Sequence, residues 1–200
     1  MIKVDSTPVP PPPSAPPPTA APPAAARPPA PPTPGTTRTA ASIRREKLRE
    51  QFWPGSASEI WDRKKENGFS TIPRTLGLIM TLIEELADRD KGKDVSRVYF
   101  ELWCRNFDEG LIEITDEEAM AFASGFTAPN RNVRTWKERI DVLQKLGFIQ
   151  VVPVGSKKHG YIFLPDPHKV IKKLKAEGRV SQSWWGAYAK RALEIGHIIP

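Results

Sequence analysis

The chain has 200 residues, a formal net charge of +7 and a single cysteine, Cys104. That length suits one domain or one and a half, and a lone cysteine excludes an internal disulfide, so a reducing cytoplasm is the expected compartment. No apolar run is long enough to span a bilayer and no apolar leader is evident, so we expect neither a membrane partner nor a targeting segment.

Residues 1–41 form a segment of low complexity that holds fifteen of the 22 prolines, and alanine, threonine and serine fill most of its other positions. This composition offers too little apolar surface to offset the entropy of ordering, and proline removes amide donors. We predict a disordered, Pro/Ala-rich tail that leans towards polyproline II. A flexible spacer is the favoured role, and binding of SH3-like partners is the alternative.

Charge is segregated along the chain. Residues 67–128 carry six basic and twelve acidic side chains, whereas residues 129–200 carry fourteen basic and five acidic side chains. Basic charge gathered in one part of a sequence is typical of a polyanion-binding face. The alternative is an excess of basic residues that serves only solubility. That would explain the positive net charge, but it explains less well why basic residues gather in one part of the chain.

Two short helices are predicted after the tail. The first covers residues 42–52 and ends before a Pro-Gly pair. The second begins at Ser56, because Glu59 stands three residues later and the two form a capping box. Both belong to a charged lead-in that extends to residue 69.

The first predicted core helix begins at a cap on Ser70 or Thr71 and runs to about residue 88, because apolar residues recur there at helical spacing. A second helix is predicted at about 95–105. The segment 111–114 is short, apolar and rich in isoleucine, which predicts a single strand.

The next two helices are predicted to form a helix-turn-helix. Residues 115–118 (Thr-Asp-Glu-Glu) read as a second capping box, and the helix that they open stops at 124–125 (Ser-Gly). After a short connection, the helix at 130–146 ends at Gly147, a residue suited to a left-handed C-terminal position. Two helices joined by a tight turn that contains glycine are typical of this motif. The apolar stripe of the second helix consists of Val133, Trp136, Ile140 and Leu143.

A β-hairpin with a basic tip is predicted after this helix. Apolar strands at 148–154 and 161–164 flank the turn 155–160, which carries Lys157 and Lys158. A mobile basic tip can contact phosphate, although solubilising turns are also common in edge hairpins.

Two further helices are predicted after residue 167, one basic and one aromatic. On the aromatic helix, Trp185, Tyr188 and Ile195 share one side. We expect this side to contact the protein's own core. A homodimer interface through the C-terminal helix is the alternative, because aromatic residues dominate such interfaces.

The order helix, strand, helix, turn, helix, strand, basic loop, strand, over about 72–165, resembles the winged-helix (winged helix-turn-helix) superfamily. Val133, Leu143 and then 147–149 (Gly-Phe-Ile) match a pattern found in many bacterial members. The resemblance implies a mainly α fold with a small β-hairpin wing, of the α+β class. It implies a second helix at 115–124, a recognition helix at 130–146 and a wing at 154–160.

Two features depart from the family pattern. The helix at about 95–105 is an insertion, and the turn before the recognition helix, which contains Pro129, is longer than the tightest examples. The predicted organisation is a disordered tail at 1–41, a charged helical lead-in at 42–69, a winged-helix DNA-binding domain at 70–166 and basic and aromatic helices at 167–200.

The candidate DNA contacts lie at the start of the recognition helix and on the wing. Arginine can read guanine and asparagine can read adenine through paired hydrogen bonds, whereas lysine and threonine more often meet phosphate. An ordinary solvated helix face is the alternative, and Glu138 and Asp141 favour it because carboxylates repel phosphate. The candidates are Arg131, Asn132, Arg134, Thr135, Lys137, Lys157, Lys158 and His159.

No metal, cofactor or catalytic pattern accompanies these residues. The three histidines and Cys104 lack ligand spacing, Cys104 reads as a half-buried helix residue, and no phosphate-binding glycine loop occurs. We therefore expect a DNA-binding protein without enzymatic activity or cofactor, cytoplasmic and associated with the nucleoid. Transcription regulation is the first hypothesis. Plasmid or phage replication or partition is the second, and a winged-helix protein-interaction module without DNA binding is the third.

Overall fold

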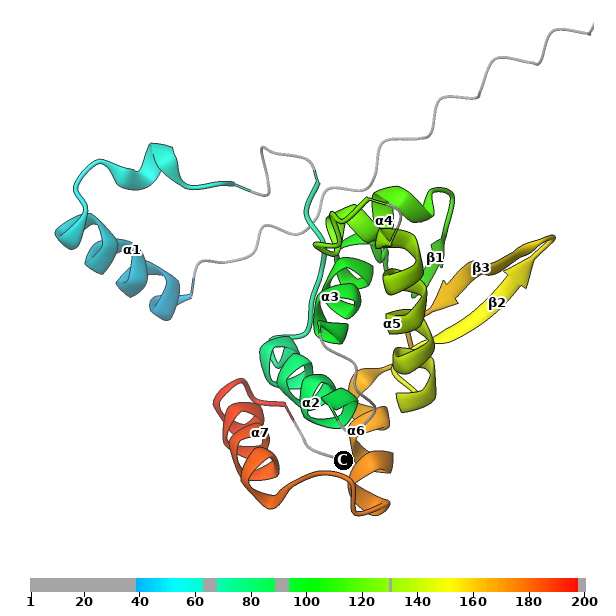
Figure 1. Cartoon of the computed structure of the whole chain (residues 1–200). Helices are drawn as coiled ribbons and strands as arrows, with labels where there is room; N and C mark the ends of the chain where they lie inside the picture. Colours follow the sequence, from blue (N-terminus) through cyan, green and yellow to red (C-terminus); the bar gives the residue numbers. More distant parts are fainter. Residues whose placement is uncertain (1–38, 63–67, 89–93, 130, 198–200) are drawn as a thin grey trace, which may run out of the picture. The chain divides into compact units, whose positions relative to one another are not determined.

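The computed structural model describes residues 39–62, 68–88, 94–129 and 131–197 (Figure 1). The predicted disordered tail lies outside the described residues except at its last three positions. The chain divides into two units, residues 1–60 and 61–200, and each is described by itself.

In the first unit the predicted helix is present as α1 (Ala40–Phe52). It is capped by the Thr39 hydroxyl, which accepts a hydrogen bond from the Ser42 amide at 3.2 Å. The second predicted helix is only one 3-10 turn, η1 (Ser56–Glu59), and the capping box expected there was wrong. Gly55 occupies the cap position in the left-handed conformation and supplies no side chain.

The second unit is mainly helical with a three-stranded antiparallel sheet, and it therefore has an α+β fold. The helical pattern of the sequence is confirmed at the predicted places. The helices are α2 (Leu76–Asp88), α3 (Val95–Arg105), α4 (Glu117–Ala123), α5 (Asn132–Leu146), α6 (Pro167–Ala176) and α7 (Gln182–Glu194).

The core helix α2 begins later than predicted. Ser70 is not its cap, because the Ser70 hydroxyl instead donates to the Trp103 carbonyl of α3 at 2.7 Å. The segment before α2 is thereby tied to a neighbouring helix, and the first helical turn forms only after Pro73, whose carbonyl accepts from the Leu76 amide at 2.9 Å.

The sheet has the strand order β1-β3-β2, with β1 (Leu111–Glu113), β2 (Gln150–Val154) and β3 (Lys157–Phe163). The central row of Ile112, Ile162 and Val151 packs against the apolar core. The hairpin β2–β3 extends beyond the helices on the right of Figure 1. The single predicted strand after α3 is therefore the third strand of this sheet.

One hydrophobic core joins the helices to the sheet. Trp136, Ile140 and Leu143 of α5 have no exposed surface, and Phe148, which follows α5, meets Tyr99 of α3 edge to face with 5.5 Å between ring centroids. The stripe read from the sequence of α5 is thus its buried face, and this leaves the opposite face of α5 to solvent.

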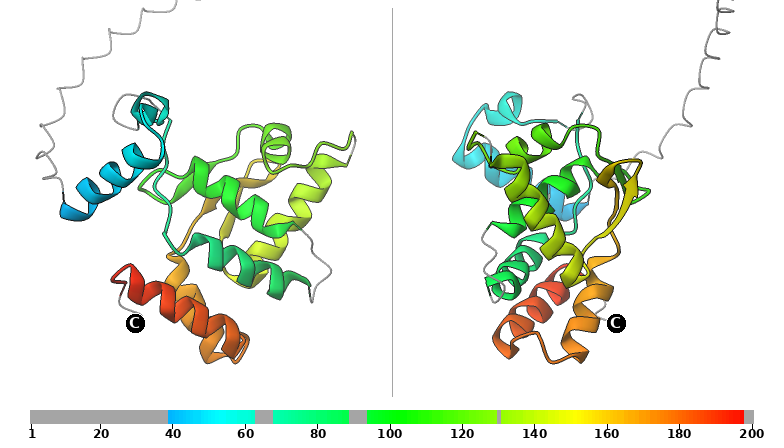
Figure 2. Two further views of the ribbon diagram at one scale, coloured as in Figure 1. Left: turned by 90° about the vertical axis from the view of Figure 1, so that its left-hand side faces the viewer. Right: turned by 45° about the vertical axis from the view of Figure 1, so that its right-hand side comes forward.

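The C-terminal helices belong to the same core. The Trp184 indole of α7 donates to the Leu78 carbonyl of α2 at 2.8 Å, and α7 lies alongside α2 in both views of Figure 2. Tyr188 is buried and Trp185 is partly buried beneath the Lys175 ammonium, 3.1 Å from the ring centroid. The aromatic side of α7 therefore contacts the protein's own core, as expected. Within the described segments, no helix combines the length and the apolar character that a membrane crossing needs.

Candidate nucleic-acid interface

The two helices of the predicted helix-turn-helix are α4 and α5. The α4 N-terminus is capped by Asp116, whose carboxylate accepts from the amides of Glu118 and Ala119 at 2.9 and 3.0 Å. The prediction that Thr115 caps this helix was wrong. The one-residue shift has a simple cause, since a carboxylate at the cap also complements the positive end of the helix dipole.

Gly125 ends α4 with a φ of +89°. The Phe126 amide donates to the Ala121 carbonyl, and the Gly125 amide donates to the Phe122 carbonyl, which is the pattern of a Schellman motif. A short turn then leads to α5, which starts at Asn132. The predicted glycine-containing turn between the two helices is confirmed, and it places the exposed start of α5 beside α4.

The start of α5 presents polar and basic side chains to solvent. Arg131 is exposed, Arg134 is 83% exposed, and Asn132 and Thr135 are half-buried. Lys137 is held by Glu117 of α4, with 2.7 Å between Nζ and Oε2. This ion pair joins the two helices of the motif.

Glu138 on this face of α5 is paired with arginines of the same helix. Glu138 pairs with Arg134 at 3.1 Å and with Arg139 at 3.7 Å. The repulsion that Glu138 was expected to exert on phosphate is therefore partly neutralised. The same ion pair also occupies Arg134, whose guanidinium would have to leave Glu138 before it could contact another group.

The hairpin turn is shorter than predicted. Only Gly155 and Ser156 form it, and β3 already begins at Lys157. A bulge follows, because Val152 pairs with Tyr161 but Val154 pairs with Lys157. Lys157, which was expected on a mobile tip, is thus paired with Val154.

Gly160 lies in this bulge, where β3 crosses close to β2. A β-carbon at Gly160 would lie 2.6 Å from the Val154 β-carbon and 2.8 Å from the Val154 backbone nitrogen. Real side chains do not come so close, so only glycine fits this position. The bulge changes the direction of the neighbouring side chain, His159.

His159 was wrongly expected on the exposed turn. Its side chain is 1% exposed and packs against Trp136 of α5, with 5.8 Å between ring centroids and an edge-to-face angle of 79°. The bulge turns this residue from the outer face of the hairpin towards α5. His159 therefore fastens the hairpin to α5, and its side chain is withdrawn from solvent.

Asp141 of α5 completes the attachment. Its carboxylate accepts from the Lys158 ammonium at 2.8 Å and lies 3.4 Å from Nε2 of His159. Partial desolvation raises the pKa of Asp141, but the hydrogen bonds and charges of Lys158 and His159 outweigh that effect and lower it below the ordinary value. Asp141 is therefore a charged anchor for the hairpin rather than an isolated acid facing phosphate.

Lys157 lies on the other side of the hairpin. Its ammonium donates to the Thr115 carbonyl at 3.3 Å, just before α4, and its side chain is exposed. The basic side chains of α5 and of the hairpin are thus linked to one another through α4, Asp141 and the Trp136–His159 contact.

Sequence reasoning missed this anchor of Trp136, Asp141 and His159. Each residue was noticed separately, as a core position, an unfavourable acid and a polar donor. The contact depends on the bulge at Gly160, and only the isolated glycine in a strand pattern hints at a bulge.

Metal and cysteine chemistry find little support in the ranges that the structure describes. No group of three or more His, Cys, Asp or Glu side chains converges there. Cys104 is exposed on α3, not half-buried as expected. Some loss of solvent around its thiol, together with the Glu101 charge, still raises its pKa against the opposing effect of Arg105. A raised pKa disfavours the reactive thiolate.

Comparisons with models of protein families, with curated proteins and with solved structures found no match for this chain. The function proposed below therefore rests on geometry, charge and the resemblance noted in the sequence.

Proposed function

We propose that the chain is a DNA-binding winged-helix protein that regulates transcription, with α5 as its recognition helix and β2–β3 as its wing. One observation supports this most. The exposed basic start of α5 and the lysines of the hairpin are held together by the ion pair and ring contact that join Lys158, Asp141, His159 and Trp136. Two elements of positive charge fixed to each other are suited to grip one duplex.

In this proposal, the first two turns of α5 enter the major groove. Arg131, Asn132 and Arg134 have the donors and acceptors that read base edges, and Arg131 makes no ion pair with the described residues. Thr135 and Lys137, on the same part of α5, would contact phosphate.

The wing would contact the DNA backbone through Lys157 and Lys158. Lys158 is 68% exposed although it pairs with Asp141, so a phosphate can approach its ammonium from the solvent side. His159 is left out of this role because it is buried. The wing therefore contributes charge and position, and the helix contributes sequence discrimination.

The proposal is tested by selection of duplexes from a random-sequence library with the purified full chain. We expect an enriched motif, and a two-fold symmetric motif would indicate a dimer. The Arg134→Ala variant should relax the preference at one position of that motif by about 1–3 kcal/mol. An unenriched library, with no retention of DNA at low salt, would contradict the proposal.

A second candidate is a winged-helix module that binds protein, and the outer face of the sheet favours it. Leu111 of β1 and Val152 of β2 are more than half exposed, and Phe107 in the loop before β1 is 77% exposed. Such a group of apolar side chains is typical of an interaction surface. Under this alternative the chain would bind one protein partner in a fixed ratio and retain no DNA, and Leu111→Glu would abolish that binding.

A further inference from the structure

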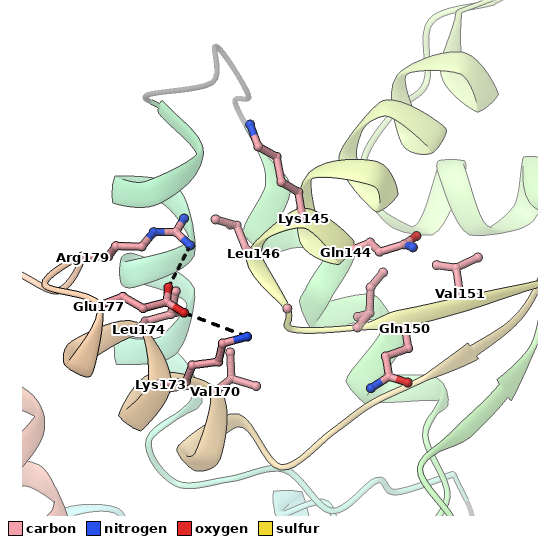
Figure 3. A pocket seen from close by; sticks show the side chains of 12 residues that line it. Gln144, Lys145, Leu146, Gln150, Val151, Val170, Lys173, Leu174, Glu177 and Arg179 are labelled. Carbon is pink, nitrogen blue, oxygen red and sulfur yellow. Dashed lines mark ion pairs between the residues drawn. The ribbon is translucent and has the colours of Figure 1, made fainter.

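A groove lies between the C-terminal end of α5, the start of β2 and helix α6 (Figure 3). Its volume of about 660 Å³ is within the range of small-molecule sites. Leu146, Ile149 and Leu174 lie beneath the groove and are each almost fully buried in the core. The apolar surface that the groove offers to a ligand comes from Val151 and Val170, which are partly buried and pack on that core.

Two cations and one carboxylate line the wall formed by α6 and the residues after it. Lys173 and Arg179 flank Glu177, at 3.9 and 3.6 Å from its carboxylate oxygens (Figure 3). These separations are long beside the 2.7 and 2.8 Å of the Lys137 and Lys158 ion pairs. Lys173 is 80% exposed and Arg179 is 36% exposed, so both cations keep hydrogen-bond donors for another anion.

The opposite wall carries neutral hydrogen-bonding groups. Gln144 from the last turn of α5 and Gln150 from β2 supply amides, while Lys145 extends away from Lys173 (Figure 3). Gly147 lies between these walls. A β-carbon at Gly147 would be 3.9 Å from a methyl group of Val170, so α6 sits directly against the end of α5.

We propose that this groove binds a small organic anion, a carboxylate or phosphate ester with an apolar body about the size of one ring. Lys173 and Arg179 would donate charge-assisted hydrogen bonds to the anionic group. The apolar body would cover the floor beside Val170 and Val151, and the glutamine amides would meet polar substituents. This site is separate from the proposed DNA surface and does not depend on DNA binding.

The test is a titration of the 15N-labelled full chain, followed by amide chemical shifts. Phenyl phosphate is the main probe. Benzyl alcohol keeps the ring without the charge, and inorganic phosphate keeps the charge without the ring. We expect phenyl phosphate to shift the amides of Gly147, Gln150, Val170 and Arg179 with the highest affinity of the three.

Lys173→Gln and Arg179→Gln should each weaken phenyl phosphate binding by roughly tenfold. Lys190→Gln, which removes an exposed lysine of α7 outside the groove, should leave the affinity unchanged. The proposal is overturned if no groove amide shifts with phenyl phosphate, if benzyl alcohol binds as tightly, if inorganic phosphate alone binds as tightly, or if both groove variants bind like the wild type.

Discussion

At the scale of single residues, the close approach at Gly160 explains why the hairpin holds its shape. Gly160→Ala forces a β-carbon against the Val154 backbone, which cannot move aside as a flexible side chain could. We predict that this variant loses about 1–3 kcal/mol of unfolding free energy, measured by urea denaturation.

Gly186→Ala is the matched control for that substitution. Gly186 is a residue of α7, and a β-carbon there would meet nothing within 4 Å. Because alanine favours helix over glycine, this variant should gain up to about 1 kcal/mol. Equal losses in the two variants would show that the contact with Val154 has no special role.

Asp141 gives the hairpin attachment a pH dependence. Its pKa is lower in the folded chain than in the unfolded chain, so the unfolded chain takes up the proton first as pH falls. Its stabilisation is therefore complete above about pH 5, and it is lost progressively as pH falls below about 4 and through the lowered pKa. Asp141→Asn should destabilise the protein at pH 6 and have a smaller effect at pH 3.

Urea denaturation at the two pH values measures this difference. Glu85→Gln, which removes an exposed carboxylate of α2, is the control and should have a small effect at both. If Asp141→Asn costs the same at pH 3 as at pH 6, the carboxylate charge does not hold the hairpin.

Residue-level features were the hardest to predict from the sequence. The basic residues at the start of α5 were recognised because the sequence alone shows both the helix start and the charges there. The burial of His159 was not, because it depends on a bulge whose extra residues reverse the direction of a side chain. Asp141 was judged without its partner, which lies 17 positions away in Lys158.

At the scale of elements, the contact between α6 and α7 should respond to mild acid. Nδ1 of His168 on α6 lies 2.5 Å from the Tyr188 hydroxyl of α7. The His168 ring also lies beside that of His197, with 4.1 Å between centroids and a tilt of 34°. Burial lowers the pKa of His168, and the charge of His197 lowers it further, while Asp166 opposes both.

Because the folded pKa of His168 is lowered, the unfolded chain binds the proton first. The stabilisation is therefore present above about pH 7 and is lost as pH falls below about 6. His168→Gln retains a hydrogen-bonding group and cannot titrate. Its urea midpoint should fall less between pH 7.5 and 5.5 than that of the wild type, and an equal fall would exclude His168 as the cause.

Elements with strong periodicity were predicted well. The apolar spacing of α2, α3 and α5 is set by helical geometry, and Gly147 marked the end of α5 correctly. The lengths of η1 and of the hairpin turn were predicted poorly. Both depend on local backbone conformations, the left-handed Gly55 and the bulge at Gly160, that propensity alone does not determine.

At the scale of the whole molecule, the basic charge that gathers late in the sequence is found on a few particular helices and strands. Most of the described basic side chains of the second unit lie on α5, the hairpin, α6 and α7. We assign the α5 and hairpin group to DNA and the groove beside α6 to a small anion. The sequence alone could not separate these two groups, because both lie in the same basic stretch.

We propose that the start of α5 and the β2–β3 hairpin grip DNA, and the salt dependence of affinity tests this most directly. For a B-form duplex, log K falls with log salt by about 0.9 for each phosphate contact. The test variant changes Arg131, Arg134, Lys157 and Lys158 to glutamine. The control removes the same charge elsewhere by changing Lys169, Lys172, Lys190 and Arg191 to glutamine.

Fluorescence anisotropy with a labelled duplex at several salt concentrations gives both slopes. We predict that the test variant binds more weakly and has a slope shallower by about 2, as expected for the lost phosphate contacts of Lys157 and Lys158. The control should keep most of the wild-type slope. Equal slopes in the test variant and the wild type, or a greater loss in the control, would contradict the assignment of α5 and the wing as the DNA surface.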